Sequence, residues 1–237
     1  MKPLLSVFLD GLKPESLKHM PFVNSFCHKS RIKGEFGYSI ACHGSMYSGV
    51  HTNKHKLWFV WKKSPETSPF KKIKLLANLP LSNTLPAKLF LHKLAVKLSD
   101  KNTSFFGIPR VVNVPSSFIS ELDVTEKKCY DEEGYIEDYP SLFDILRRKN
   151  IDFHVVGMDK SEKEESKILE RTVKFKKVPW LYWFIGDVDH FSHEFGQDSN
   201  ESIKRLNNLD RLLEYKYNQL VKQIGAVDFM LWSDHGH

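Results

Sequence analysis

Decisive for the fold is the stretch Leu181-Tyr-Trp-Phe-Ile185-Gly-Asp-Val-Asp189-His-Phe-Ser-His193. Its first five residues are apolar, which is typical of a strand buried on both faces of a parallel sheet. Asp189 follows this strand and His193 comes four residues later, so a carboxylate and an imidazole can turn toward one point, as in half of a metal site. The alternative is a polar loop rich in histidine.

Similar apolar runs predict three other strands, over 4–9, 153–156 and 228–233. Helical patterns alternate with the strands. They include a helix opened by Pro14, one over 142–150 capped by Ser141, a charged one over 161–171 and an amphipathic one over 200–224. Alternating strands and helices predict an α/β fold with a mainly parallel sheet flanked by helices.

The length of the chain suits one domain, which we predict to span 1–237. Residues 57–130 lack clear periodicity apart from a helix over 85–99, and we predict that they form an insertion or cap within that domain. Aromatic residues and lysines are mixed there. They could grip a substrate that carries a phosphate, or they could simply cover the core.

Composition limits the class of protein. Hydrophobic residues make up 41% of the chain and charged residues 27%, an ordinary balance for a globular protein. No apolar run approaches the ~18 residues of a membrane span, and the N-terminal run ends at Asp10, too early for a signal peptide. The three cysteines, Cys27, Cys42 and Cys129, are odd in number and scattered, which favours reduced thiols and a cytoplasmic location.

Charge is distributed unevenly along the chain. Residues 1–130 carry 20 Lys and Arg against 8 Asp and Glu, a net of +12, whereas residues 131–237 carry 15 against 21, a net of −6. The basic half suits a phosphate-bearing or polyanionic partner or a membrane surface, and a solvated lysine-rich face explains it equally well. Specific binding to nucleic acid is not expected, because no known binding motif accompanies the charge.

A short segment of small and apolar residues runs from Ser39 to Gly49. We predict that Ser39 caps the N-terminus of a helix and that Gly49 ends it. A hydroxyl in that position meets the first backbone N–H groups of the helix and the positive end of its dipole, and these features also bind a phosphoryl group. An ordinary capping serine is the alternative.

An aspartate follows each of three predicted strands. The three are Asp10, Asp189 and Asp234. Because the carboxyl ends of parallel strands share one edge of a sheet, their carboxylates are expected to converge there. His193 and His235 accompany two of them, and Ser39 is expected at the same rim. Carboxylates crowded together repel each other unless a cation neutralises them, so the set predicts a metal site.

In these positions the sequence resembles the alkaline phosphatase superfamily, and within it the type I phosphodiesterase/nucleotide pyrophosphatase branch. The resemblance covers three blocks of the chain. They are Leu9-Asp10-Gly11-Leu12; Tyr38-Ser39 through Ser45, with Ser48-Gly49-Val50 and His55; and Asp189-x3-His193-x2-Gly196 with Ser233-Asp234-His235-Gly236 beyond it. It implies an alkaline phosphatase-like domain that lacks its C-terminal part.

The resemblance also implies two divalent metal ions, usually zinc, with manganese as the alternative. The implied ligands of one ion are Asp10, Asp234, His235 and the oxygen of Ser39; those of the other are Asp189, His193 and a third histidine, for which the chain has no matching position. The implied substrate is a phosphate ester of a small molecule, a nucleotide or a glycan.

Several positions depart from the pattern of the family. Ser39 stands where this branch more often has threonine, and Lys56 replaces a glycine. Cys42 stands where an asparagine usually donates to a phosphate oxygen, which makes it a weak substrate-binding residue.

The predicted function is metal-dependent hydrolysis of a phosphodiester through a phosphoserine intermediate on Ser39. A cation beside this serine would favour its ionised form, and paired cations would stabilise the attacking and leaving oxygens. The alternatives are a truncated, inactive relative with a partial metal site, and a sulfatase or phosphotransferase that uses the same scaffold.

Overall fold

The computed structural model describes residues 2–37, 39–99, 103–104, 107–157 and 177–236. Contacts divide the chain into two compact units, one formed by Met1–Gly34 with Leu142–His237 and the other by Glu35–Ser141. The segment predicted as an insertion, 57–130, lies within the second unit, and its role as a cap of a single domain stays a prediction. The helix predicted over 161–171 lies outside the described residues.

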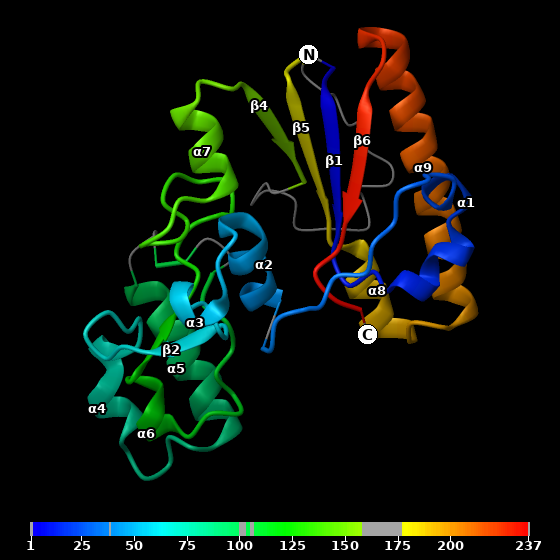
Figure 1. Ribbon diagram of the computed structural model, residues 1–237. Coiled ribbons are helices and arrows are strands. Elements are labelled where there is room, and N and C mark those ends of the chain that lie inside the picture. Colours follow the sequence, from blue (N-terminus) through cyan, green and yellow to red (C-terminus); the bar gives the residue numbers. More distant parts are fainter. Residues whose placement is uncertain (1, 38, 100–102, 105–106, 158–176, 237) are drawn as a thin grey trace. The chain divides into compact units, whose positions relative to one another are not determined.

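Parallel strands form the sheet of the first unit (Figure 1). Among the described residues, its order is β4 (Phe153–Val156), β5 (Trp180–Ile185), β1 (Leu4–Leu9) and β6 (Asp228–Trp232). Each neighbouring pair is parallel, and Leu4 of β1 is aligned with both Trp180 and Asp228. The predicted α/β fold is therefore confirmed, and the carboxyl ends of β5, β1 and β6 lie at one edge of the sheet.

Both faces of the sheet are covered, which explains the continuous apolar runs. One face packs against α9 (Asn200–Ile224). The buried residues of that core include Val7, Leu9, Leu181, Trp183, Leu206, Leu209 and Leu213. On the other face Trp180 and Tyr182 contact Phe143 of α7 (Leu142–Arg148), with ring centroids 5.6 and 5.4 Å apart.

The N-terminal segment after β1 is tied to α9. The helix predicted at Pro14 forms as a 3-10 helix, η1 (Pro14–His19), and α1 (Pro21–Asn24) follows it. Asp210 of α9 is buried and accepts hydrogen bonds from the backbone N–H groups of Phe22 at 2.9 Å and Val23 at 3.0 Å. This carboxylate therefore caps α1 and holds the segment against the long helix.

The second unit consists mainly of short elements. They are α2 (Ser39–Ser48), α3 (Thr52–His55), β2 (Trp61–Lys63), η2 (Lys71–Ile73), α4 (Lys74–Ala77), α5 (Leu85–Leu98), α6 (Ser116–Ile119) and β3 (Leu122–Val124). β2 and β3 pair antiparallel, and a separate apolar core includes Phe70, Ile73, Leu91, Ala95 and Ile119. The helix predicted over 85–99 is confirmed as α5. Among the helices that the structure describes, none has the length and apolar character that crossing a membrane demands.

Candidate active site

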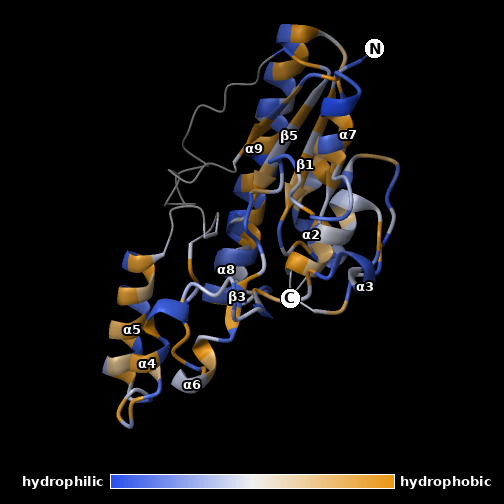
Figure 2. Cartoon of the chain, turned by 90° about the vertical axis from the view of Figure 1, so that its left-hand side faces the viewer, coloured by the Kyte–Doolittle hydropathy of each residue, from blue (hydrophilic) through white to orange (hydrophobic). Residues whose placement is uncertain are grey.

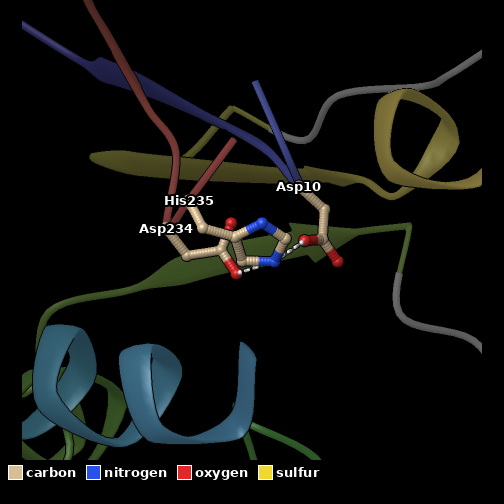
Figure 3. Close-up of side chains that lie close together, drawn as sticks. All are labelled: Asp10, Asp234 and His235. Carbon is tan, nitrogen blue, oxygen red and sulfur yellow. Dashed lines mark ion pairs between the residues drawn. The ribbon is translucent and has the colours of Figure 1, made fainter. Parts of the chain in front are cut away.

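The ends of β1 and β6 bring together Asp10, Asp234 and His235 (Figure 3). One potential ligand atom from each residue lies within 4.8 Å of the others. The Nε2 atom of His235 is 3.5 Å from Oδ1 of Asp10 and 3.2 Å from Oδ2 of Asp234. The side chain of Asp234 is fully buried and that of Asp10 is 16% exposed, so two carboxylates are concentrated where little water reaches them.

Hydrogen bonds between the two loops fix this geometry. The backbone N–H of Gly11 donates to Oδ1 of Asp234 at 3.3 Å. The N–H of Leu12 donates to the Ser233 hydroxyl at 2.9 Å, and that hydroxyl donates to the carbonyl of His235, also at 2.9 Å. Because these hydrogen bonds join the two loops, the backbone itself holds Asp10 and Asp234 close together. The convergence expected from parallel strand ends is present for these three residues.

Asp189 and His193 lie on α8 (Asp187–Phe195), which begins two residues after β5. The polar segment is thus a helix rather than a loop, and the two residues share one face of it because they are four positions apart. Oδ1 of Asp189 is 3.5 Å from Nε2 of His193, and the histidine side chain is 68% exposed.

Gly11 allows the second acidic group to approach the first. A Cβ atom placed on Gly11 would lie 3.2 Å from Oδ1 of Asp189 and 3.0 Å from its Cα, and the φ of Gly11 is +75°. A side chain there would therefore strain the backbone and crowd the carboxylate. Asp189 therefore lies directly beside the loop that carries Asp10, but among the described residues the group of potential ligand atoms within 4.8 Å of one another contains neither Asp189 nor His193.

Ser39 and Cys42 belong to the second unit, so the structure describes their surroundings within that unit. Ser39 is the first residue of α2 and is half-buried, one position further into the helix than the predicted cap. Gly49 follows the helix with a φ of +70°, as predicted. Cys42 is buried, and its Sγ lies 3.9 Å from the carbonyl oxygen of Glu35. The roles of Ser39 and Cys42 toward a substrate stay predictions.

A hydrogen-bonded chain joins α2 to α3. Its members Ser45 and His55 belong to the block of the sequence that resembles the family, whereas Glu35 was not singled out. The Ser45 hydroxyl is 2.8 Å from Oε1 of Glu35 and 3.0 Å from Nε2 of His55, and the N–H of Leu57 donates to Nδ1 of His55 at 3.1 Å. A carboxylate only accepts, so Ser45 donates to Glu35 and Nε2 of His55 donates to Ser45. Burial lowers the pKa of His55, which agrees with this neutral form.

This chain of hydrogen bonds excludes one chemical role for Ser45. A histidine that activates a serine must accept its proton, whereas Nε2 of His55 already carries one. Hydrogen bonds from His51 and Ser45 keep the pKa of Glu35 below its ordinary value, so its carboxylate is ionised near neutral pH. Glu35, Ser45 and His55 therefore hold α2 and α3 together and support the helix that begins at Ser39.

Gly44 is the sequence signal that could have revealed this packing, since a glycine inside a helix often marks a close approach. A Cβ atom on Gly44 would lie 2.5 Å from Cε1 of His55. We expect Gly44→Ala to lower the free energy of unfolding by about 1–3 kcal/mol, because the hydrogen-bonded ring cannot retreat. Urea unfolding followed by circular dichroism measures the loss.

The matched control for this prediction is the same substitution in a His55→Ala background. Without the ring, alanine is expected to stabilise α2 by about 1 kcal/mol relative to glycine, because it is the better helix former. A substitution that is equally costly in both backgrounds would show that His55 is not what requires the glycine.

The model of the family type I phosphodiesterase/nucleotide pyrophosphatase matches residues 4–237. The chain belongs to this family. No curated protein sequence matches the chain.

Two solved structures share the fold of this phosphodiesterase-family chain. Both are of murine ectonucleotide pyrophosphatase/phosphodiesterase 5, one of them an inactive variant in complex with AMP. The TM-scores are 0.60 for the AMP complex and 0.59 for the other, with 13% identity in each case. The alignment covers all of this chain but 57% of theirs, so the chain spans just over half their length. At this identity the likeness concerns the fold alone.

Proposed function

We propose that the chain is a metal-dependent phosphoesterase that hydrolyses a phosphodiester, with Ser39 as the nucleophile. The observation that carries the proposal is the grouping of Asp10, Asp234 and His235 at the carboxyl edge of the sheet. Ligand sites of open α/β sheets occur along that edge. Membership of the phosphodiesterase family supports the class of reaction.

The donor set fits a divalent transition metal. Two carboxylate oxygens and one imidazole nitrogen within 4.8 Å of one another are the ligand types that zinc and manganese accept. In the proposal Asp10, Asp234 and His235 would hold one ion, and the family resemblance implies the Ser39 oxygen as its further ligand. Asp189 and His193 would hold a second ion, which would need a further ligand. We propose zinc as the metal, with manganese as the alternative.

The roles of the residues follow from the chemistry of phosphodiester hydrolysis. Bound divalent cations lower the pKa of a neighbouring hydroxyl and neutralise the charge of the phosphoryl oxygens. Oγ of Ser39 forms a bond to phosphorus, and the bond to one alcohol breaks in line with the attack. This leaves a phosphoserine that still carries the other alcohol. Water then breaks the serine ester, which releases a phosphomonoester and restores the Ser39 hydroxyl.

We further propose a nucleotide or a glycan phosphate as the substrate class. The murine structure with AMP shows a protein of this fold binding a nucleotide. In this chain, basic residues are concentrated in positions 1–130, which carry a net charge of +12. Such an excess favours an anionic substrate.

The proposal is tested with the full chain treated with a chelator and then supplied with zinc or manganese. Three aryl esters serve as substrates: a phosphodiester, a phosphomonoester and a sulfate. We expect no turnover without metal and restored turnover with metal, with the diester preferred. Preference for the sulfate would instead identify a sulfatase. Tight metal binding without turnover of any ester would identify an inactive relative.

A further inference from the structure

A second feature of the molecule, separate from the proposed active site, is a lysine-rich apolar surface on the second unit. We propose that the outer face of α5, together with α4 and the turns that join the two helices, binds the surface of a membrane that contains anionic phospholipid. We refer to these residues as the α4–α5 surface. Its members are Leu75, Leu81, Leu85, Leu89, Lys93, Val96 and Lys97.

α5 has an apolar stripe on each of two faces. Leu91 and Ala95 are buried in the core of the unit. Leu85, Leu89 and Val96 are spaced by four and seven residues, which places them on one side of the helix, and they are 60%, 38% and 48% exposed. A helix that only covered a core would have one apolar stripe. The second, exposed stripe of α5 therefore indicates an apolar binding partner.

The neighbouring segment continues this exposed apolar character. Leu75 is 87% exposed and Leu81 is 77% exposed. In Figure 2, α4 and α5 both carry hydrophobic colouring. Large exposed leucines clustered on neighbouring elements mark interaction surfaces, whereas isolated ones are ordinary.

The charge of the segment decides which partner fits. Residues 67–99 contain six lysines and no aspartate, glutamate or arginine. Lys93 and Lys97 are exposed on α5 beside the apolar stripe, and neither takes part in an ion pair within the described part of the chain. Lysine is depleted in the buried centre of protein–protein interfaces, whereas it is favoured beside anionic lipid headgroups.

The combination matches a helix that lies in the membrane interface. Such helices bury leucine and phenylalanine at the boundary with the acyl chains, and their lysines extend to the headgroups. Phe90, which is 60% exposed, adds an aromatic ring on the side of the helix that carries Lys93 and Lys97. Residues 67–99 contain no acidic side chain, and the acidic residue paired with Lys74 of α4, Glu121 at 3.8 Å, neutralises one lysine without reversing the positive charge of the segment.

Co-sedimentation of the full chain with vesicles tests the proposal. Vesicles of phosphatidylcholine alone are compared with vesicles that also contain phosphatidylglycerol. We expect the second kind to bind roughly tenfold more tightly, and the difference to shrink at high salt. Equal or absent binding to the two kinds of vesicle would overturn the proposal.

Two double variants separate the apolar and ionic contributions. Leu89→Gln with Val96→Gln is expected to weaken binding by about tenfold or more to both kinds of vesicle. Lys93→Gln with Lys97→Gln is expected to abolish most of the preference for phosphatidylglycerol. All four side chains are exposed, so the fold is expected to persist.

Matched controls lie in the first unit. Ile145 is 43% exposed on α7, and Lys204 and Lys222 are exposed on α9. Ile145→Gln and the pair Lys204→Gln with Lys222→Gln are expected to leave vesicle binding unchanged. If they weaken it as much as the α5 variants do, the α4–α5 surface is not the binding site. A dimer in solution that Leu89→Gln with Val96→Gln dissolves, without vesicle binding, would assign the surface to a second copy and overturn the proposal.

Discussion

Ser39→Ala is expected to lower kcat for an aryl phosphodiester by about 10³-fold or more, because the atom that attacks phosphorus is removed. Three of the four proposed ligands of that ion, Asp10, Asp234 and His235, remain in the variant, so zinc affinity is expected to fall much less than kcat. Initial rates at saturating zinc, together with a zinc titration of the same preparation, measure the two effects separately. Acid quenching of the wild-type protein during turnover is expected to trap a phosphoryl group on the Ser39 peptide.

The matched control for this variant is Ser48→Ala in the same helix. The Ser48 hydroxyl donates to the carbonyl of Gly44 at 2.6 Å, within the last turn of α2. We expect its removal to leave kcat nearly unchanged. Full activity in Ser39→Ala, or a trapped phosphoryl group on another residue, would show that Ser39 is not the nucleophile. Neither result would contradict the proposed metal site.

The strands could be predicted from the sequence because both faces of the sheet are covered. That burial favours apolar side chains on both faces, so Trp180–Ile185 is apolar throughout. Leu4–Leu9 is apolar except for Ser6, whose buried hydroxyl accepts a hydrogen bond from Nε1 of Trp180 at 2.7 Å. Parallel strands also share one edge, and for this reason the order of strands and acidic residues along the chain was enough to predict that Asp10 meets Asp234 and His235.

The helix α8 was missed because its polar residues dominate a short segment. Val188, Phe191 and Ser192 are its buried residues in the middle turns, and their spacing of three and four is helical. Three buried positions are too few to reveal a helical period among the aspartates and histidines around them. The helix changes the geometry of the site, because Asp189 reaches the loop of Gly11 from a helical turn rather than from a strand end.

Packing of the second unit could not be predicted for two physical reasons. α4 and α6 are four residues long, about one turn each, so neither can display a hydrophobic period. The hydrogen bonds of Ser45 connect residues ten positions apart in both directions, Glu35 and His55. Such pairing depends on how the chain folds back on itself, which a local pattern does not encode.

Asp234→Asn is expected to weaken zinc binding while the fold is retained. Asparagine keeps the shape of the side chain and an oxygen that can accept the N–H of Gly11. It removes one negative charge from a fully buried position, where water screens the attraction between a carboxylate and a cation least. We expect zinc affinity to fall by more than the ~10² that losing a hydrogen-bond partner of a metal ligand costs. Isothermal titration with zinc measures this loss, and turnover at limiting zinc is expected to fall with it.

Thermal stability with and without zinc distinguishes a lost ligand from a damaged fold. In the metal-free protein, Asp234→Asn keeps the oxygen that accepts the N–H of Gly11 and reduces the negative charge around His235, so Tm is expected to change little. Saturating zinc is expected to raise Tm of the wild type, because the ion binds the folded state, and to have little effect on the variant. The control Asp228→Asn makes the same change at the exposed start of β6 and should keep the full zinc response. If Asp234→Asn also keeps that response, Asp234 is not a ligand, and the group at the ends of β1 and β6 does not hold the metal.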